Sequence, residues 1–166
     1  CSDCQGDGIP DICQLDYARG GGAVLYEDFE SGVVPPPGWT ALASTPATWE
    51  IWQWGAYEGT YMALCQYDSN YTDVQDEWLI SPELNASGML TLNGFAQGSI
   101  PWGVDPKDNY DVEAWVVIGP KVNDGNDVLL GLLDDVWLPD YGWGEFNYDF
   151  AAPVDTFRIG FRFHGY

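Results

Sequence analysis

Residues 157–164 read Phe-Arg-Ile-Gly-Phe-Arg-Phe-His, and this stretch decides the fold class. Apolar side chains alternate along it with Arg, Gly and His at a period of two. In an extended strand this spacing places all the apolar side chains on one face, whereas no helix produces it. The stretch therefore predicts a β-strand with one face in a hydrophobic core.

The sequence before this strand predicts more short strands and little helix. Residues 112–118 also alternate, but their second face is partly apolar, which favours a strand lying between layers. Asn123-Asp124-Gly125 is typical of a hairpin turn, and residues 129–136 could form one helical turn. With 20 Gly and 11 Pro as punctuation, the chain is expected to be an all-β sandwich or jelly roll. Further strands are predicted at 61–67, 77–80 and 89–96.

The charge balance excludes two classes of partner. The chain has 166 residues with 26 Asp and Glu against 5 Lys and Arg, a formal net charge of −21. Nucleic acids and anionic membranes both need a basic face, which these few cations cannot build. No apolar run is long enough for a membrane span, so membrane insertion is not expected. Hydrophobic residues nevertheless make up 46% of the chain, which is enough for a core in one domain.

Three of the four cysteines lie in a short N-terminal segment. We predict a linker segment at 1–22, a flexible joint at its glycines, and a sandwich domain at 23–166. An even number of cysteines predicts disulfides and an extracellular, oxidising compartment. Cys4 and Cys13 form the easiest local pair and leave Cys1 with Cys65, but three pairings are open. Zinc is the rival interpretation of the Cys1-x-x-Cys4 spacing, although Cys65 is remote from it.

The same segment predicts a calcium loop. Oxygen-bearing side chains stand at loop positions 1, 3, 5 and 9, and Gly8 stands at position 6, where a sharp turn is needed. Position 12 is Gln14, which offers one oxygen where a Glu would offer two. The alternative is a solvated acidic linker. The expected Ca²⁺ ligands are Asp3, Gln5, Asp7, the Ile9 carbonyl, Asp11 and Gln14.

Residues 3–11 resemble the calcium-binding repeats of the thrombospondin type 3 kind and the related loops of bacterial dockerins. They follow the pattern D-x-N/D-x-D-G-x-x-D over little more than a dozen residues. In those families calcium stiffens an extended linker. The resemblance therefore implies a spacer at this point of the chain rather than a catalytic element.

A second resemblance covers most of the body. Glu-Asp-Phe-Glu-Ser-Gly at 27–32, Pro-Gly-Trp at 37–39, Gly-Thr-Tyr-Met-Ala at 59–63 and Asp-Glu-Trp-Leu-Ile-Ser-Pro at 76–82 follow one another in order. This order resembles secreted bacterial domains of the cleaved-adhesin or choice-of-anchor J type, which have a jelly-roll sandwich similar to the MAM fold. The resemblance implies a structural Ca²⁺ near Asp28 and Glu30, with Asp76 or Glu77 contributing; solvated acids are the alternative.

One departure from that family concerns the last strand. Family members continue after a strand like 157–163 through a Gly-rich turn into one more strand, whereas this sequence stops at Tyr166. Either the protein is longer, or a neighbouring subunit supplies the strand. In the second case the strand expected at 23–26 would be the donor, and the subunits would polymerise into a fibre by strand exchange.

Catalysis has little support in the sequence. A Ser-His-Asp triad would have to use His164 at the chain end, no Gly-x-Ser-x-Gly is present, and 26 acids produce paired carboxylates by chance. We therefore predict a non-enzymatic, secreted bacterial adhesion or structural module. It would bind copies of itself, another cell-surface protein or a glycan.

The alternative is a carbohydrate-binding module of a larger secreted hydrolase. Trp102, Trp137 and Trp143 stand among Gly, Pro and Asp in expected loops and would form the platform on which a sugar stacks. Two sequons, at Asn70 and Asn85, are compatible with a glycoprotein.

Overall fold

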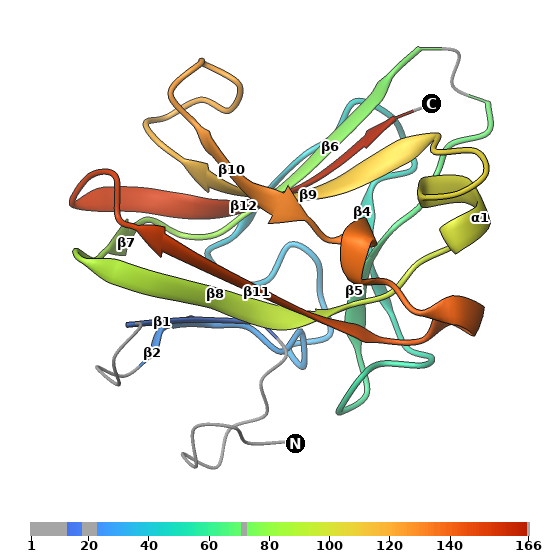
Figure 1. The fold of residues 1–166 in the computed structure, drawn as a ribbon, viewed down its shortest axis with the longest axis horizontal. Helices are drawn as coiled ribbons and strands as arrows, with labels where there is room; N and C mark the ends of the chain where they lie inside the picture. Colours follow the sequence, from blue (N-terminus) through green and yellow to red (C-terminus); the bar gives the residue numbers. More distant parts are fainter. Residues whose placement is uncertain (1–12, 18–22, 71–72, 166) are drawn as a thin grey trace.

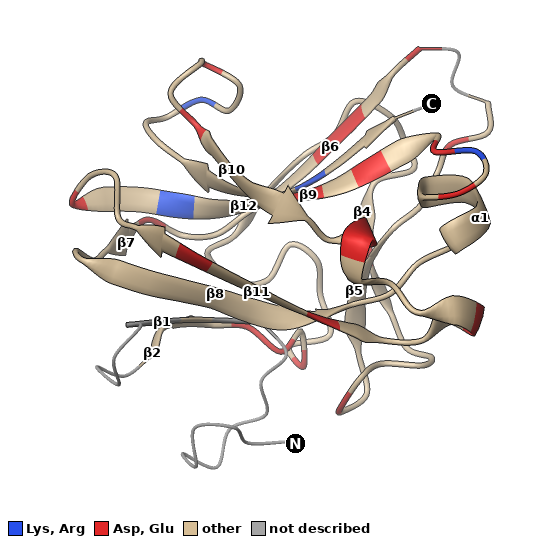
Figure 2. Cartoon of the chain, in the orientation of Figure 1, with Lys and Arg blue, Asp and Glu red and all other residues tan. Residues whose placement is uncertain are grey.

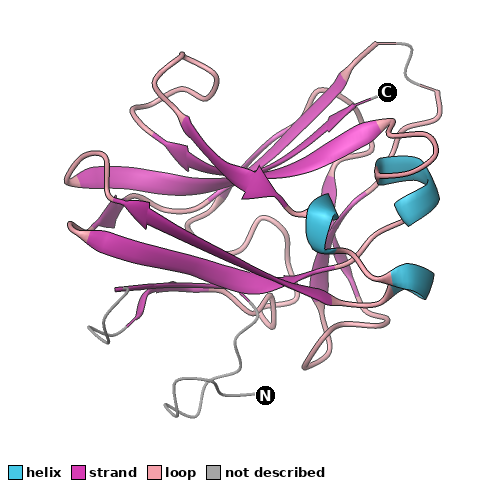
Figure 3. Ribbon diagram, viewed as in Figure 1, coloured by secondary structure: helices cyan, strands magenta, loops and turns pink. Residues whose placement is uncertain are grey.

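The structure is a computed structural model that describes residues 13–17, 23–70 and 73–165. Within these residues the chain forms two antiparallel sheets packed face to face, with only short helical segments (Figures 1 and 3). The four-stranded sheet has the order β11-β8-β1-β2 and the six-stranded sheet the order β10-β9-β12-β6-β3. The predicted all-β sandwich is therefore confirmed.

The elements have the following bounds. The first sheet contains β1 (Cys13–Tyr17), β2 (Ala23–Tyr26), β8 (Met89–Ala96) and β11 (Gly144–Ala151). The second contains β3 (Thr40–Leu42), β6 (Gln75–Ile80), β9 (Tyr110–Val117), β10 (Val128–Leu132) and β12 (Thr156–Gly165), with β7 (Leu84–Asn85) paired to β12. A separate hairpin pairs β4 (Trp49–Trp52) with β5 (Met62–Cys65). The helical segments are α1 (Ile100–Gly103), η1 (Asp134–Val136) and η2 (Pro139–Tyr141).

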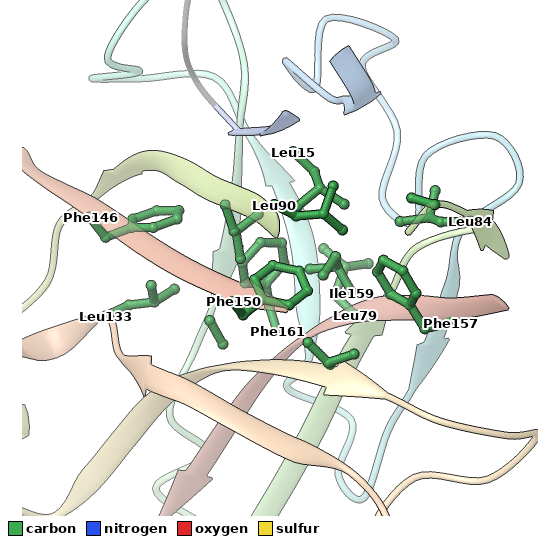
Figure 4. Packing of buried hydrophobic residues seen from close by; sticks show 14 of the residues in the cluster. Leu15, Leu79, Leu84, Leu90, Leu133, Phe146, Phe150, Phe157, Ile159 and Phe161 are labelled. Carbon is green, nitrogen blue, oxygen red and sulfur yellow. The ribbon is translucent and has the colours of Figure 1, made fainter. Parts of the chain in front are cut away.

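The alternating stretch is the centre of the second sheet. β12 lies between β9 and β6, and Phe161 pairs with Ala114 on one side and Leu79 on the other. The four apolar side chains of the stretch are buried and face the first sheet, as predicted. Figure 4 shows side chains from both sheets meeting in this layer, with Leu15 and Leu90 opposite Leu79 and Ile159.

The four-stranded sheet includes a strand from before residue 23. β1 falls inside the range expected to be a linker, yet it pairs with β8 along its whole length and with β2 on its other side. Leu15 is fully buried, so burial of this apolar side chain inserts the strand into the sheet. The strand at 23–26, expected as a donor to a neighbour, pairs in this chain with its own β1.

Two local expectations have different outcomes. The turn at 123–125 is confirmed, since it joins the paired strands β9 and β10 and Asn123 and Gly125 have positive φ. Within 129–136, where the sequence predicts one helical turn, residues 134–136 form a helical turn and the residues up to 132 belong to strand β10. The run Val-Leu-Leu-Gly-Leu-Leu has no alternation, so its pairing with β9 determines its conformation.

Candidate ligand-binding pocket

A pocket of about 460 Å³ opens at one end of the sandwich, between the β4–β5 hairpin and the adjoining ends of both sheets. In Figure 1 the hairpin and α1 lie at the same end of the molecule. Twelve of the lining residues are aromatic, and none is charged. This composition is typical of a site that takes up apolar groups.

The floor of the pocket is part of the main core. Leu79, Phe146 and Phe161 line the pocket and also belong to the core cluster that joins the two sheets. The pocket is therefore a gap in core packing that opens to the surface. The surrounding apolar side chains lack partners on this side, which costs dispersion contacts unless another group fills the space.

Buried polar side chains hold the hairpin in place on one side of the pocket. The Glu77 carboxylate is fully buried and accepts hydrogen bonds from the backbone N–H of Ser44 (3.1 Å), the backbone N–H of Thr45 (3.0 Å) and the Ser44 hydroxyl (2.6 Å). Trp49 donates its indole N–H to the Glu77 carbonyl at 3.2 Å. Gln75 is also buried and donates to the carbonyls of Ala47 and Gln66. These bonds tie the hairpin and the segment before it to β6.

The opposite side is formed by Trp137, which follows η1. Its indole packs directly over the backbone of Gly98 and Gly103, where a Cβ would collide with the ring. Tyr110 lies beside the ring, with centroids 6.2 Å apart. Only 8% of Trp137 is exposed, and its indole N–H finds no hydrogen-bond partner among the described residues. A buried donor without a partner is costly to the stability of the fold.

Three exposed aromatic side chains mark the mouth. Trp52 is 39% exposed, Tyr67 45% and Tyr141 65%, and all three line the pocket. Trp143 lines it as well and is fixed by an indole hydrogen bond to the Gly55 carbonyl (3.1 Å). The mouth therefore offers ring faces at the surface, whereas the floor is apolar core.

The predicted platform of three tryptophans does not form. Trp137 is buried because it covers two glycines, which contradicts its predicted role as an exposed ring. Trp143 is half-buried in the pocket wall. Trp102 is exposed but lies outside the lining, and the ammonium of Lys107 stands 3.2 Å from its ring centroid. Sequence reasoning missed the mouth, although the aromatic residues around 49–57 and 137–143 could have indicated it.

Burial changes the titration of groups at this end. Burial raises the pKa of the Cys65 thiol far above its usual range, aided by the nearby carboxylates of Glu77 and Glu50. Cys65 therefore stays a thiol and is unsuited to nucleophilic chemistry. Burial also raises the pKa of Tyr110 to about 12. Asp134, which accepts a hydrogen bond from the backbone N–H of Val112 (2.9 Å), has its pKa raised by burial to about 6.

A cluster of charged and titratable side chains lies on the outer face of the six-stranded sheet. Asp111, Glu113 and His164 place their ligand atoms within 4.8 Å of one another. Arg162 binds both Glu113 (3.3 Å) and Asp76 (2.7 Å) in the same row of side chains. Hydrogen bonds and charge attraction from Arg162 hold the pKa of Asp76 below its ordinary value, despite partial burial.

The acids expected to share a second metal lie apart in the fold. Asp28 and Glu30 lie in the turn after β2, where Asp28 accepts from the Glu30 N–H (3.0 Å) and Glu30 accepts from the Thr60 and Tyr61 N–H groups. Asp76 lies in β6 and is bound to Arg162. Among the described residues these acids do not form a metal-binding group of three.

Several predicted residues lie wholly or partly outside the described chain. The calcium ligands Asp3 to Asp11 and the cysteines at 1 and 4 are outside it, and only the backbone of Cys13 and Gln14 is described, in β1. Cys65 forms no disulfide with any described residue. Asn70 and Asn85, the sequon residues, are both exposed. The calcium loop and the disulfides stay predictions.

Comparison with solved structures shows a known fold. One match is the K2 cleaved adhesin domain of Lys-gingipain, with a TM-score of 0.59 and 14% identity over 85% of this chain and 94% of that one. The K1 domain from Porphyromonas gingivalis W83 has a TM-score of 0.59 and 17% identity, over 84% of this chain and 91% of that one. The K3 domain from the same strain has a TM-score of 0.58 and 18% identity, over 84% and 86%.

The chain has the fold of a cleaved adhesin domain. At these identities the likeness concerns the fold alone, and it agrees with the resemblance noted in the motifs at 27–82. No family model matches the sequence, and neither does any curated protein. In the described part of the chain no helix is long and apolar enough to cross a membrane.

Proposed function

We propose that the chain is an extracellular binding module of the adhesion type and that it holds its ligand in the pocket beside the β4–β5 hairpin. The observation that carries this proposal is the pocket itself, which is open, uncharged and lined largely by aromatic side chains. The cleaved adhesin fold supports the same conclusion. Such clefts, with apolar walls and a few polar groups, are where proteins bind partners.

The apolar walls of the pocket argue that it is used. Cavities in cores cost about 24 cal/mol per Å³ when nothing fills them. The pocket of about 460 Å³ opens to the surface, so it holds water and this cost does not apply to it in full. The water gains few hydrogen bonds from apolar walls. A ligand with an apolar part would be favoured over that water.

Ala63→Leu tests the proposal by placing a larger side chain in the pocket. Ala63 lines the pocket from β5 and packs against the core, so a larger apolar side chain occupies ligand space without burying a polar group. We expect thermal shifts by peptide and oligosaccharide ligands in the wild type, and no shift in the variant at an unchanged or higher melting temperature. Trp54→Ala is the matched control, because Trp54 is exposed and outside the lining. A ligand set that shifts neither protein, or shifts both equally, contradicts the proposal.

Carbohydrate binding is the second candidate, and the exposed rings of Trp52 and Tyr141 at the mouth favour it. Ring faces stack on sugars, and the platform would be at the pocket mouth rather than at Trp102. A glycan array that binds the wild type and not Tyr141→Ala would support this candidate.

We also propose calcium binding by the predicted loop, on the basis of the spacing of its ligands: Asp3, Gln5, Asp7, Ile9, Asp11 and Gln14. Chelation should lower the melting temperature of the full chain, and restored Ca²⁺ should recover it. If the melting temperature is the same with and without the chelator, the chain has no stabilising calcium site.

Assembly by strand exchange is the remaining proposal. β2 is a four-residue edge strand held on one side by β1, and an equivalent strand from another copy could replace it. Light scattering after size exclusion, with calcium present and at high protein concentration, tests this idea. A single monomeric peak would contradict it.

A further inference from the structure

We infer that the pocket is built for a basic protein segment that inserts one aromatic or large aliphatic side chain and places Lys or Arg beside the mouth. This inference rests on the proposed binding role of the pocket and names its ligand class. Three properties of the site support it: an uncharged interior, a shortage of unused polar groups, and an excess of negative charge outside.

The interior selects an apolar group. None of the lining residues is charged, so a buried charge on the ligand would find no opposite charge to compensate its lost hydration. The indole N–H groups of Trp49 and Trp143 already donate to backbone carbonyls. The Trp137 indole N–H is buried without a partner in the described chain, so it presents no accessible hydrogen-bonding group to a ligand.

The same scarcity of polar groups argues against a sugar deep in the pocket. A sugar ring carries several hydroxyl groups, and each one that is buried needs a partner. The lining is mainly Phe, Trp, Tyr and Leu, and apart from the indole N–H groups and the thiol its polar side-chain groups are three Tyr hydroxyls, the Ser99 hydroxyl and the Gln97 amide. Sugar hydroxyls that lie away from these few groups would lose their water without replacement. A side chain such as Phe or Leu carries no such groups, and the pocket volume is within the range of ordinary ligand sites.

The surroundings select a positive charge beside the apolar anchor. The chain has 26 acids against 5 bases, and Figure 2 shows the acids spread over strands and loops of the whole fold. Each aromatic residue of the mouth has an acid within two residues in the sequence and no base as near. A basic segment would be drawn to this region, whereas an anionic amphiphile would be repelled. The pairs are Trp52 with Glu50, Tyr67 with Asp68, and Tyr141 with Asp140.

The exposed rings of the mouth can also receive the cations directly. Lys and Arg side chains bind ring faces within about 6 Å of the centroid. The described residues contain two such contacts, where Lys107 lies over Trp102 and Arg162 lies over Trp78 at 5.3 Å. Among the described residues no such contact covers the rings of Trp52 or Tyr141, so both faces can take a cation from a partner.

The test uses three heptapeptides in isothermal titration against the full chain. The first has a central Phe, two Lys on each side of it and one Gly at each end. The second replaces Phe by Ala, and the third replaces the four Lys by Glu. We expect the first to bind, and the other two to bind at least about tenfold more weakly. Raising NaCl from 50 to 300 mM should weaken the first peptide about fivefold, because salt screens the charge attraction.

Protein variants separate this inference from the proposed function. Ala63→Leu should abolish binding of the first peptide, Asp140→Asn should weaken it, and Trp54→Ala should leave it unchanged. If the Glu peptide or a glycan binds the pocket equally well and Ala63→Leu removes that binding, the ligand class is wrong while the binding role stands. If no peptide, glycan or apolar probe binds in a manner that Ala63→Leu removes, the binding role itself is wrong.

Discussion

The two ends of the sandwich are stabilised in different ways. At the end formed by β7 and the start of β12, Phe157 pairs with Leu84 across the strands and meets Phe150 edge to face, with centroids 6.1 Å apart. Side chains from both sheets fill this end (Figure 4). At the other end the sheets diverge around the pocket, and hydrogen bonds from Glu77 and Gln75 hold the hairpin. The first end is stabilised by close packing of apolar side chains. The second combines the hydrogen bonds of Glu77 and Gln75 with an open pocket.

Phe157→Ala should have the largest effect, because it removes a buried ring from the closed end. Only 1% of Phe157 is exposed, and truncation of such a ring costs about 3–5 kcal/mol of the free energy of unfolding. Tyr141→Ala at the open end is the matched control and should change it by about 0.5 kcal/mol or less. Urea denaturation measures both. If Phe157→Ala and Tyr141→Ala lower the free energy of unfolding equally, the two ends do not differ in packing.

Glu77→Ala should have the next largest effect and act at the open end. It leaves the backbone N–H groups of Ser44 and Thr45 without their acceptor, at a cost of about 2–4 kcal/mol. The hairpin should loosen, so ligand binding in the pocket should weaken together with stability. Glu77→Gln keeps one acceptor oxygen and should recover part of the loss. If Glu77→Ala has the same free energy of unfolding as the wild type, the hydrogen bonds of Glu77 are not needed to hold the hairpin.

Asp134→Asn should stabilise the open end in a pH-dependent way. Burial raises the folded-state pKa of Asp134 to about 6, above its unfolded value, so the folded protein takes up a proton at a pH where the unfolded chain does not. The contribution of Asp134 to the stability of the wild type should therefore become less unfavourable as pH falls from about 7 to about 4. The Asn variant keeps an acceptor for the Val112 N–H and needs no proton. At pH 8 it should be more stable than wild type by about 2 kcal/mol, with little advantage near pH 4.

Melting curves of the two proteins from pH 4 to 8 measure this difference. A constant difference across that range would mean that Asp134 does not titrate as its burial implies.

The closed end and the open end also differ in how well the sequence predicts them. The alternation at 157–164 and in β9 reports directly which side chains enter the core, because a strand's period of two is local information. The pocket depends on contacts between distant segments: Trp137 on Gly98 and Gly103, and Glu77 on Ser44 and Thr45. Residue pattern alone contains no signal for such contacts. The same limit explains why Trp137 is buried against expectation and why the role of β1 in the sheet was missed.

Lys107→Ala should have the smallest effect, and it tests the one predicted platform residue that is exposed. The Lys107 ammonium lies 3.2 Å from the centroid of the Trp102 ring, at a surface site where cation–π contacts contribute about 0.5–1 kcal/mol. A double-mutant cycle with Trp102→Ala should give a coupling energy in that range, decreasing slightly with salt. Because Trp102 is outside the pocket lining, binding of the basic Phe heptapeptide should not change. If Lys107→Ala instead strengthens glycan binding, the Lys107 side chain covers a sugar platform, and the functional surface extends beyond the pocket.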